Sequence, residues 1–448
     1  MRRVLSKTGY LTLLLSSLFL SQAHAVNLET AYLSAQSYDA DLQSAEATRL
    51  EAEEGIPVAR AALLPQINYN FQRNKANTTN YQLSTGTNRN TGDYFTESES
   101  LTLRQPLYKK SAWASFESAQ AQSEAANANY RKEVQNLGLR VASSYLEVLL
   151  ARVAQSLANA ETKALEGLVA LAERAIKAGT GTRTDVDDAR ARRDMAKARV
   201  SEANMLLNRA SRDFQTVTDI DASLLPAIDP RSLRGKSMAI INRAEWLARI
   251  EATSPELQSL RKQVDAANAE IERAKGGHYP SLDLVVSHQE GQSETNITVG
   301  TGYRTNYAGL QFSLPLVSGF GVMAQVRQTS ARADRVRHTL ESTRRKLLAE
   351  ADRLYLAVEL GIEKAEATEQ AIASAEQALI SAQKGVSAGT RNIVDVLDSE
   401  RRVYEMKRDQ AISIFELANN RFKFLALADA IDGEAIKYTS NWLATAQR

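Results

Sequence analysis

Two long stretches of the chain carry a helical pattern and contain no proline. No proline lies between Pro106 and Pro226, and none follows Pro315. Both stretches are rich in Ala, Glu, Lys, Arg, Gln and Leu, which are strong helix formers. In the first of them, small and apolar positions recur about every 3.67 residues, a spacing that favours nearly straight helices. We predict long helices over about 111–177, 184–218, 322–386 and 393–428.

Shorter segments alternate between apolar and polar residues, which is the pattern of β-strands. Apolar Ile67, Tyr69 and Phe71 alternate with polar neighbours between Gln66 and Gln72. This period of two predicts a sheet with one apolar and one polar face. The same pattern also fits an ordinary hairpin packed on a helix. We predict strands over about 63–74, 96–108, 280–290 and 303–316, with polar surface loops over 73–98 and 288–306.

The second half of the chain repeats the first. Leu-Gln-Ser occurs at 42–44 and again 215 residues later, and Ala-Gly-Thr occurs at 178–180 and again 210 residues later. Each half reads helix, strand, loop, strand, long helix, turn, long helix. We therefore predict an internal twofold repeat, with one copy over 26–225 and the other over 226–448.

Tight turns are expected between the long helices of each half. Gly179 and Gly181 interrupt the first helical pattern, and Gly389 interrupts the second. Glycine suits the left-handed backbone that ends many helices. Thr184 is a candidate N-cap for the returning helix, and Asp185 would then lie in its first turn, where negative charge is favoured.

Residues 1–25 have the features of a secretory signal peptide. Arg2, Arg3 and Lys7 precede a short apolar core, and a small-x-small site ends at Ala25. The alternative is a retained N-terminal anchor. Cleavage would change the formal charge from +2 to −1, so no basic surface for nucleic acid is expected.

The sequence offers little support for an enzyme or for a cofactor site. It contains no cysteine. The segments GTGTRT and GTGYRT lack the third glycine of a dinucleotide-binding loop. His278, His288 and His338 are too scattered to suggest a metal site. We predict no enzymatic activity, no cofactor and no metal.

The small number of predicted strands indicates an oligomer. Four strands are too few to close into a barrel, and an open sheet in lipid would leave its edges unpaired. Two chains would give eight strands and three would give twelve. The polar residues Gln66, Asn68, Asn70 and Gln311 suit a water-filled lumen, which favours three chains.

Several motifs resemble the outer membrane efflux protein family, the TolC-like outer membrane factors. These motifs are LPQINYNF, YPSLDLVVS, FSLPLVSGFG and AGTRNIVDVLDSERRVY, and the likeness covers both repeats in order. The resemblance implies a homotrimer with a twelve-stranded transmembrane β-barrel, four strands per chain, continued by a long α-helical barrel of coiled-coil hairpins. It also implies a location in the outer membrane of a Gram-negative bacterium, with the helical part extending into the periplasm.

The same resemblance implies roles for residues near the turns. Asp395 and Asp398 match the paired aspartates that ring the periplasmic aperture. Arg391 matches the arginine that helps to hold the gate closed, and Thr184 and Asp185 match its partners. A hydrogen bond made by a tyrosine of the family's best-known member cannot form here, because this chain has Val386 at that position.

The predicted function is the exit duct of a tripartite export system. The resemblance implies a periplasmic adaptor protein and an inner-membrane transporter, ABC-type or proton-driven, as partners. The motif AGTGTRTDVDDAR is more similar to the outer-membrane components of type I protein exporters, so protein secretion is the favoured cargo class. Small-molecule and multidrug efflux is the alternative. A periplasmic coiled-coil adaptor or structural protein is a more distant one.

Overall fold

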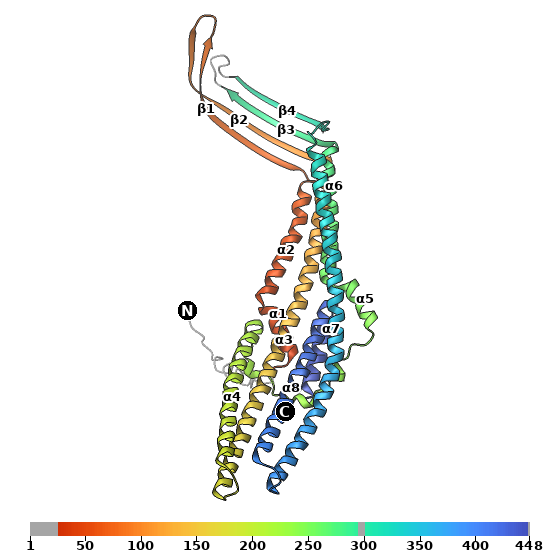
Figure 1. The fold of residues 1–448 in the computed structure, drawn as a ribbon. Coiled ribbons are helices and arrows are strands. Elements are labelled where there is room, and N and C mark those ends of the chain that lie inside the picture. The colour runs from red at the N-terminus through yellow and green to blue at the C-terminus, as the bar shows by residue number, and fades with distance from the viewer. Residues whose placement is uncertain (1–25, 294–300, 447–448) are drawn as a thin grey trace, which may run out of the picture. The chain divides into compact units, whose positions relative to one another are not determined.

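The computed structural model describes residues 26–293 and 301–446 (Figure 1). The expected signal peptide therefore lies outside the described residues. The elements, in chain order, are α1 (Leu28–Tyr38), α2 (Ala40–Ala61), β1 (Gln66–Gln82), β2 (Thr87–Lys109), α3 (Lys110–Lys177), α4 (Arg183–Thr218), α5 (Arg243–Thr253), α6 (Pro255–Lys275), β3 (Ser281–Ser293), β4 (Thr301–Ser313), α7 (Gly321–Ser387), α8 (Ile393–Leu427) and α9 (Gly433–Ala444). Short 3-10 turns follow α4 and α6.

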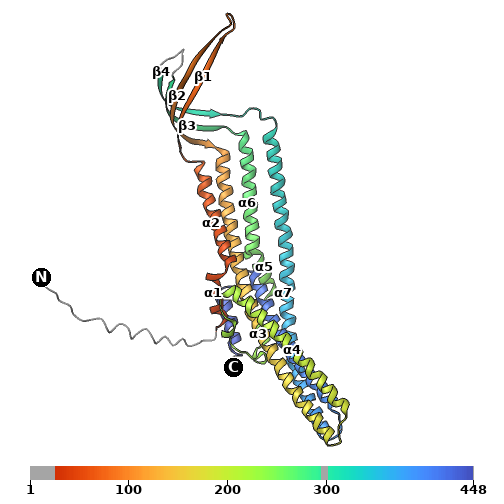
Figure 2. The ribbon, with the colours of Figure 1, turned by 90° about the vertical axis from the view of Figure 1, so that its left-hand side faces the viewer.

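The four long helices lie within the two proline-free stretches. Helix α3 has 68 residues and α7 has 67. Helix α4 returns alongside α3, and α8 returns alongside α7 (Figures 1 and 2). Each half therefore ends in a helical hairpin, and the two halves have the same order of long elements.

The chain divides into two compact units, which we describe separately. One unit consists of residues 43–132 and 251–347 and contains the sheet. Among the described residues, the other unit consists of residues 26–42, 133–250 and 348–446, and it contains both helical turns.

The sheet has four antiparallel strands in the order β1-β2-β3-β4. The central pairing, β2 with β3, joins the two repeats, and Leu103 lies opposite Val286 in it. Strands β1 and β4 form the two edges. All residues of β4 are exposed, so nothing in the described residues covers that edge.

The strands are longer than the sequence predicted, and the expected loop over 73–98 is wrong. Strand β1 continues to Gln82 and β2 begins at Thr87. Ion pairs cross this part of the hairpin, from Arg73 to Glu97 at 2.9 Å and from Lys75 to Asp93 at 2.6 Å. Polar residues that read as a loop are therefore held in the strand ladder by their partners. The expected loop over 288–306 is also wrong at both ends, because residues up to Ser293 belong to β3 and those from Thr301 belong to β4; residues 294–300 lie outside the described residues.

One face of the sheet is apolar and exposed. Ile67 is 66% exposed, Leu310 66% and Phe312 65%. Burying such a surface is favourable by roughly 25 cal/mol per Å², so an exposed apolar face marks an interaction site. No described helix is both long and apolar enough to cross a membrane.

The unit that holds the helical turns has a mixed aliphatic and aromatic core. Tyr145, Phe214 and Phe424 are fully buried. The ring of Trp246 from α5 meets Phe424 from α8 edge-on, with centroids 5.6 Å apart. This packing ties the first helix of the second repeat to the last long helix.

Candidate functional site

The two helical turns have the same backbone hydrogen bonds, displaced by 210 residues. In the first turn the N–H of Gly179 donates to the carbonyl of Ile176 at 2.9 Å, and in the second Gly389 donates to Val386 at 3.0 Å. Gly179 has a φ of +74° and Gly389 a φ of +70°. Both therefore occupy the left-handed region that favours glycine. The predicted duplication thus extends to the geometry of the turns.

The residues after the two glycines also correspond. The N–H of Gly181 donates to the carbonyl of Ala175 at 3.1 Å, and that of Arg391 donates to Gly385 at 3.2 Å. Gly181 therefore occupies the position in the first turn that Arg391 occupies in the second. A Cβ on Gly181 would lie 2.9 Å from the Cβ of Ala175, so this first turn has no room for a side chain.

A reciprocal capping box begins each returning helix. Thr182 caps α4, with its Oγ1 accepting from the N–H of Asp185 at 3.2 Å and the Asp185 carboxylate accepting from the N–H of Thr182 at 3.0 Å. Asn392 and Asp395 form the equivalent pair in α8. The expected N-cap at Thr184 is wrong, because α4 begins one residue earlier and Thr184 lies inside it, exposed.

The Arg391 side chain is exposed and has no polar partner in the described chain. Its stem lies over Gly385, where a Cβ would come within 3.0 Å of Cγ and Cδ of Arg391. Within residues 26–293 and 301–446, the Arg391 guanidinium makes no hydrogen bond or ion pair. Arg391, Thr184 and Asp185 are therefore not brought together within one chain.

Asp398 has a strong partner that the sequence analysis missed. Nη1 of Arg192 lies 2.7 Å from Oδ1 of Asp398, and Nε of Arg192 lies 3.1 Å from Asp188. The hydrogen bond from Arg192 holds the pKa of Asp398 below its usual range, and the nearby charges of Arg401 and Arg402 act in the same direction. The contact of Arg192 with Asp188 could have been predicted, because the two residues are four apart on one helix. No sequence pattern indicates the pairing of Arg192 with Asp398, which is 206 residues away.

Apolar packing beside Asp398 joins α8 to the first hairpin. Leu397 is fully buried in a cluster contributed by α3 and α4. Asp395 is exposed and Asp398 is half-buried beside Arg192, whereas Leu397 faces this cluster and Ile393 packs in a second cluster with Ala172 and Val186. The cluster consists of Leu165, Val169, Ala189, Ala196 and Leu397, with Leu168 packed against it.

A buried carboxylate follows one turn further along α8. Glu400 is 8% exposed, and no hydrogen bond or ion pair reaches its carboxylate in the described part of the chain. Burial raises the pKa of Glu400, Glu161 on α3 adds to this effect, and Lys407 opposes it. Glu161 itself is paired with Arg199 of α4 at 2.6 Å.

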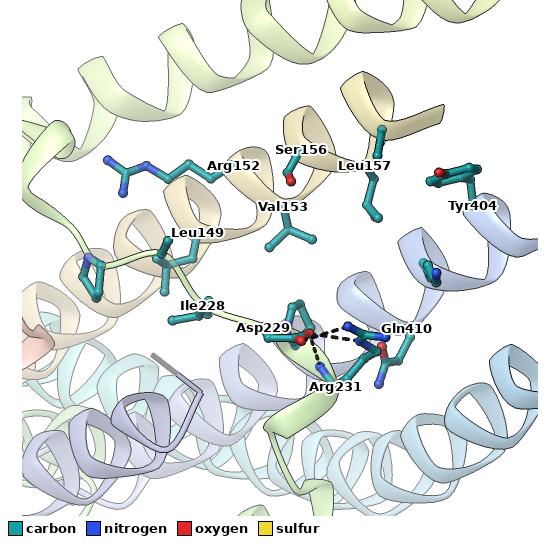
Figure 3. A pocket seen from close by; sticks show the side chains of 15 residues that line it. Leu149, Arg152, Val153, Ser156, Leu157, Ile228, Asp229, Arg231, Tyr404 and Gln410 are labelled. Carbon is teal, nitrogen blue, oxygen red and sulfur yellow. Dashed lines mark hydrogen bonds and ion pairs between the residues drawn. The ribbon is translucent and has the colours of Figure 1, made fainter. Parts of the chain in front are cut away.

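Two cavities lie on either side of Tyr404, where α8 faces α3. The larger, of about 270 Å³, is shown in Figure 3, with Val153 and Leu157 of α3 near Tyr404 of α8. The smaller, of about 220 Å³, is bounded by Glu161 and Arg199. Lys407 and Arg231 at the larger cavity are already paired, with Glu376 and Asp229 respectively. The contact between α8 and α3 is therefore loosely packed at this level.

No group of three or more His, Cys, Asp or Glu side chains in the described residues could hold a metal ion.

Comparison with known sequences identifies the family. The profile described as "Outer membrane efflux protein" matches residues 31–218 and 246–412. The chain belongs to the outer membrane efflux protein family. One matched segment lies in each repeat, so the family match covers both copies of the duplicated unit.

Two similar members of the family are named for protein secretion. The chain is 31% identical to the proteases secretion protein PrtF of Dickeya chrysanthemi, over 90% of this chain and 88% of the relative. It is 29% identical to the alkaline protease secretion protein AprF of Pseudomonas aeruginosa, over 85% and 80%. It is also 29% identical to the outer membrane protein TolC of Escherichia coli, over 91% and 81%. The chain is an outer-membrane protein that provides the exit duct of an export system.

Solved structures share the fold of the chain. A structure of CusC matches with a TM-score of 0.77 at 17% identity, covering 90% of this chain and 92% of CusC. The outer-membrane channel OprN matches with a TM-score of 0.75 at 19% identity, covering 90% of each.

Proposed function

We propose that three copies of the chain form an exit duct for type I protein secretion, gated at the periplasmic end by the two helical turns. The observation that carries this proposal is the similarity, over 90% and 85% of this chain, to two family members named for protease secretion. A passive duct needs no catalytic group, and we propose no enzymatic activity and no cofactor for it.

The sheet supports the assembly of several copies. Its edges, β1 and β4, are unpaired in one chain, and a spanning sheet must close on itself to satisfy its backbone groups in lipid. Three chains would join β4 of one copy to β1 of the next and close a twelve-stranded barrel. The exposed apolar face would contact outer-membrane lipid, and the polar face would line a wet lumen.

The helical turns support a gate in the duct. Arg391 is exposed and unpaired in the described chain, so its guanidinium is free to bind Thr184 and Asp185 of a neighbouring copy. Asp395 and Asp398 would bring carboxylates from three chains to one aperture. Such a ring favours cations, and contacts across the ring would hold the helical hairpins closed together.

The cargo class and the partners follow from the same similarity. Type I secretion requires a periplasmic adaptor protein and an energised inner-membrane transporter, which we propose as partners, ABC-type in this case. Efflux of small molecules is the second candidate, because the family member BepC of Brucella suis is named an efflux protein and is 26% identical over 83% of this chain. A proton-driven transporter would then be the inner-membrane partner.

Deletion of the gene distinguishes the two cargo classes. We expect loss of one or more proteins from the culture medium, with drug sensitivity little changed, and complementation should restore secretion. Increased drug sensitivity with an intact set of secreted proteins would support efflux instead. Native mass measurement of the detergent-extracted protein tests the assembly, and a stable monomer would contradict the trimer.

A further inference from the structure

Each helical hairpin is held together by several ion pairs of its own. In the first hairpin, α4 contacts α3 through Arg190 and Glu173 at 2.6 Å and through Arg199 and Glu161 at 2.6 Å. In the second, Lys407 of α8 contacts Glu376 of α7 at 2.7 Å. Each hairpin can therefore move as one body.

The polar connection between α4 and α8 is of a different kind. Arg192 of α4 pairs with Asp398 of α8 at 2.7 Å, and no other ion pair or hydrogen bond joins these two helices in the described chain. Arg192 is held in place from its own helix by Asp188 at 3.1 Å. The Arg192 side chain is 24% exposed and that of Asp398 46%, so the pair is shielded from solvent on the Arg192 side only, and such pairs are less screened by salt than fully exposed ones.

The contact also determines the charge near the proposed aperture. Asp395 takes part in a capping box but has no cationic partner in the described residues, whereas Asp398 has Arg192 at hydrogen-bonding distance and Arg401 at 3.9 Å. In the conformation that the structure describes, the negative charge of Asp398 is therefore largely compensated by the positive charge of Arg192. When α8 moves away from α4, the full charge of Asp398 would become available to passing ions.

We propose that Arg192 controls both gating and ion selectivity of the duct, by binding Asp398 in the closed conformation and releasing it on opening. This inference rests on the proposed function, since it requires a channel whose aperture carries Asp398. Arg192 would thereby control two properties of the duct, its opening and its ion selectivity. Opening would then add the charge of Asp398 to that of Asp395 at the aperture.

The test is a recording of single channels in planar lipid bilayers with the full-length mature protein. Arg192→Gln removes the cation and frees Asp398, so we expect conductance to rise about two- to fivefold, the range for losing one partly exposed ion pair per chain. The permeability ratio of K⁺ over Cl⁻ should rise with it. Arg192→Lys keeps the charge and should remain close to the wild type in both quantities.

Asp398→Asn separates the two effects. It breaks the same contact, so conductance should rise, but it also removes the carboxylate, so the K⁺ over Cl⁻ ratio should stay level or fall. The exchanged pair, Arg192→Asp with Asp398→Arg, restores an ion pair and should return the conductance toward that of the wild type.

Arg190→Gln is the matched control. It removes one positive charge from the same helix two positions away, but Arg190 pairs with Glu173 of its own hairpin and does not contact α8. Its conductance and permeability ratio should equal those of the wild type. Trimer migration in gels without heating shows that each variant is assembled.

Two results would overturn the inference, and they are distinguishable from failure of the proposed function. If Arg192→Gln assembles and matches Arg190→Gln in conductance and permeability ratio, Arg192 has no role in the gate, although the channel itself stands. If Asp398→Asn raises the K⁺ over Cl⁻ ratio as Arg192→Gln does, the carboxylate does not supply the charge. A wild-type protein that forms no channel at all would overturn the proposed function as well.

Discussion

Asn392 and Asp395 cap each other at the start of α8. The Asn392 side-chain oxygen accepts from the N–H of Asp395 at 3.0 Å, and the Asp395 carboxylate accepts from the N–H of Asn392 at 3.3 Å. The resemblance to the family assigned Asp395 to the aperture ring alone. The structure gives it a local role in helix initiation too, which matters for interpreting any substitution at this position.

Removing the cap should loosen the start of α8 without removing a charge. Asn392→Ala is expected to cost about 1 kcal/mol, which corresponds to about fivefold faster amide hydrogen exchange over the first turn. Exchange measured by mass spectrometry checks this, and Asn392→Ser, which keeps a capping oxygen, is the control. Equal exchange rates in the Ala and Ser variants would show that the cap does not stabilise this turn.

Protonation of Glu400 should stabilise the contact between α8 and α3. Burial raises the pKa of Glu400 in the folded protein, so the folded state favours the protonated carboxyl. The corresponding stability is fully present below the ordinary glutamate pKa of about 4.3 and is lost as pH rises through the higher folded value. Glu400→Gln mimics the protonated form at every pH.

Thermal unfolding of Glu400→Gln and wild type across the range from pH 4 to pH 8 tests this effect. The variant should have the higher melting temperature at neutral pH, and the difference should shrink toward pH 4. Glu405→Gln is the control, because the Glu405 side chain is 45% exposed. A difference between Glu400→Gln and wild type that grows on acidification would contradict the assigned sign.

Leu397 should contribute strongly to the stability of the contact between the two hairpins. It is fully buried among residues of α3 and α4, so Leu397→Ala removes buried methyl groups and leaves a cavity. We expect a loss of about 2–5 kcal/mol, measured by urea unfolding. Leu360→Ala, at a position that is 61% exposed, should change stability by less than about 0.5 kcal/mol.

Arg391 is expected to stabilise the closed gate through a neighbouring copy. Arg391→Ser should raise the conductance of the channel in bilayers. The guanidinium has no partner within the described chain, so the substitution would remove only its contact with a neighbouring copy. Arg183→Ser is the control, since the Arg183 side chain is 92% exposed at the other turn. Conductance unchanged by Arg391→Ser would count against a gate contact at this residue.

The sequence predicted the long helices well, because their composition agrees with their structure over many turns. Absence of proline and the repeated small residues fix α3 and α7 almost without reference to tertiary contacts. The strand lengths were not predictable in the same way. The polar segment after Phe71 reads as a loop, and it continues β1 only because partners such as Asp93 and Glu97 lie across the hairpin.

Residues of the candidate site were predictable only where the signal was local or came from the family. The glycine positions of both turns follow from backbone requirements that the sequence displays. Thr184 and Thr182 are both acceptable caps, and the choice between them depends on where the helix begins. The pairing of Arg192 with Asp398 and the burial of Glu400 depend on how two distant hairpins pack, and no local pattern encodes that.

The pairing of β2 with β3 has a consequence for the ancestry of the chain. A chain of half this length would hold one pair of strands and one helical hairpin, and six such half-chains would make the same ring as three whole ones. Fusion makes the β2–β3 pairing permanent and lets the two copies diverge. Gly181 and Arg391 occupy the same place in the two turns, so the proposed trimer of the fused chain would carry three arginines at this level where an unfused hexamer would carry six or none.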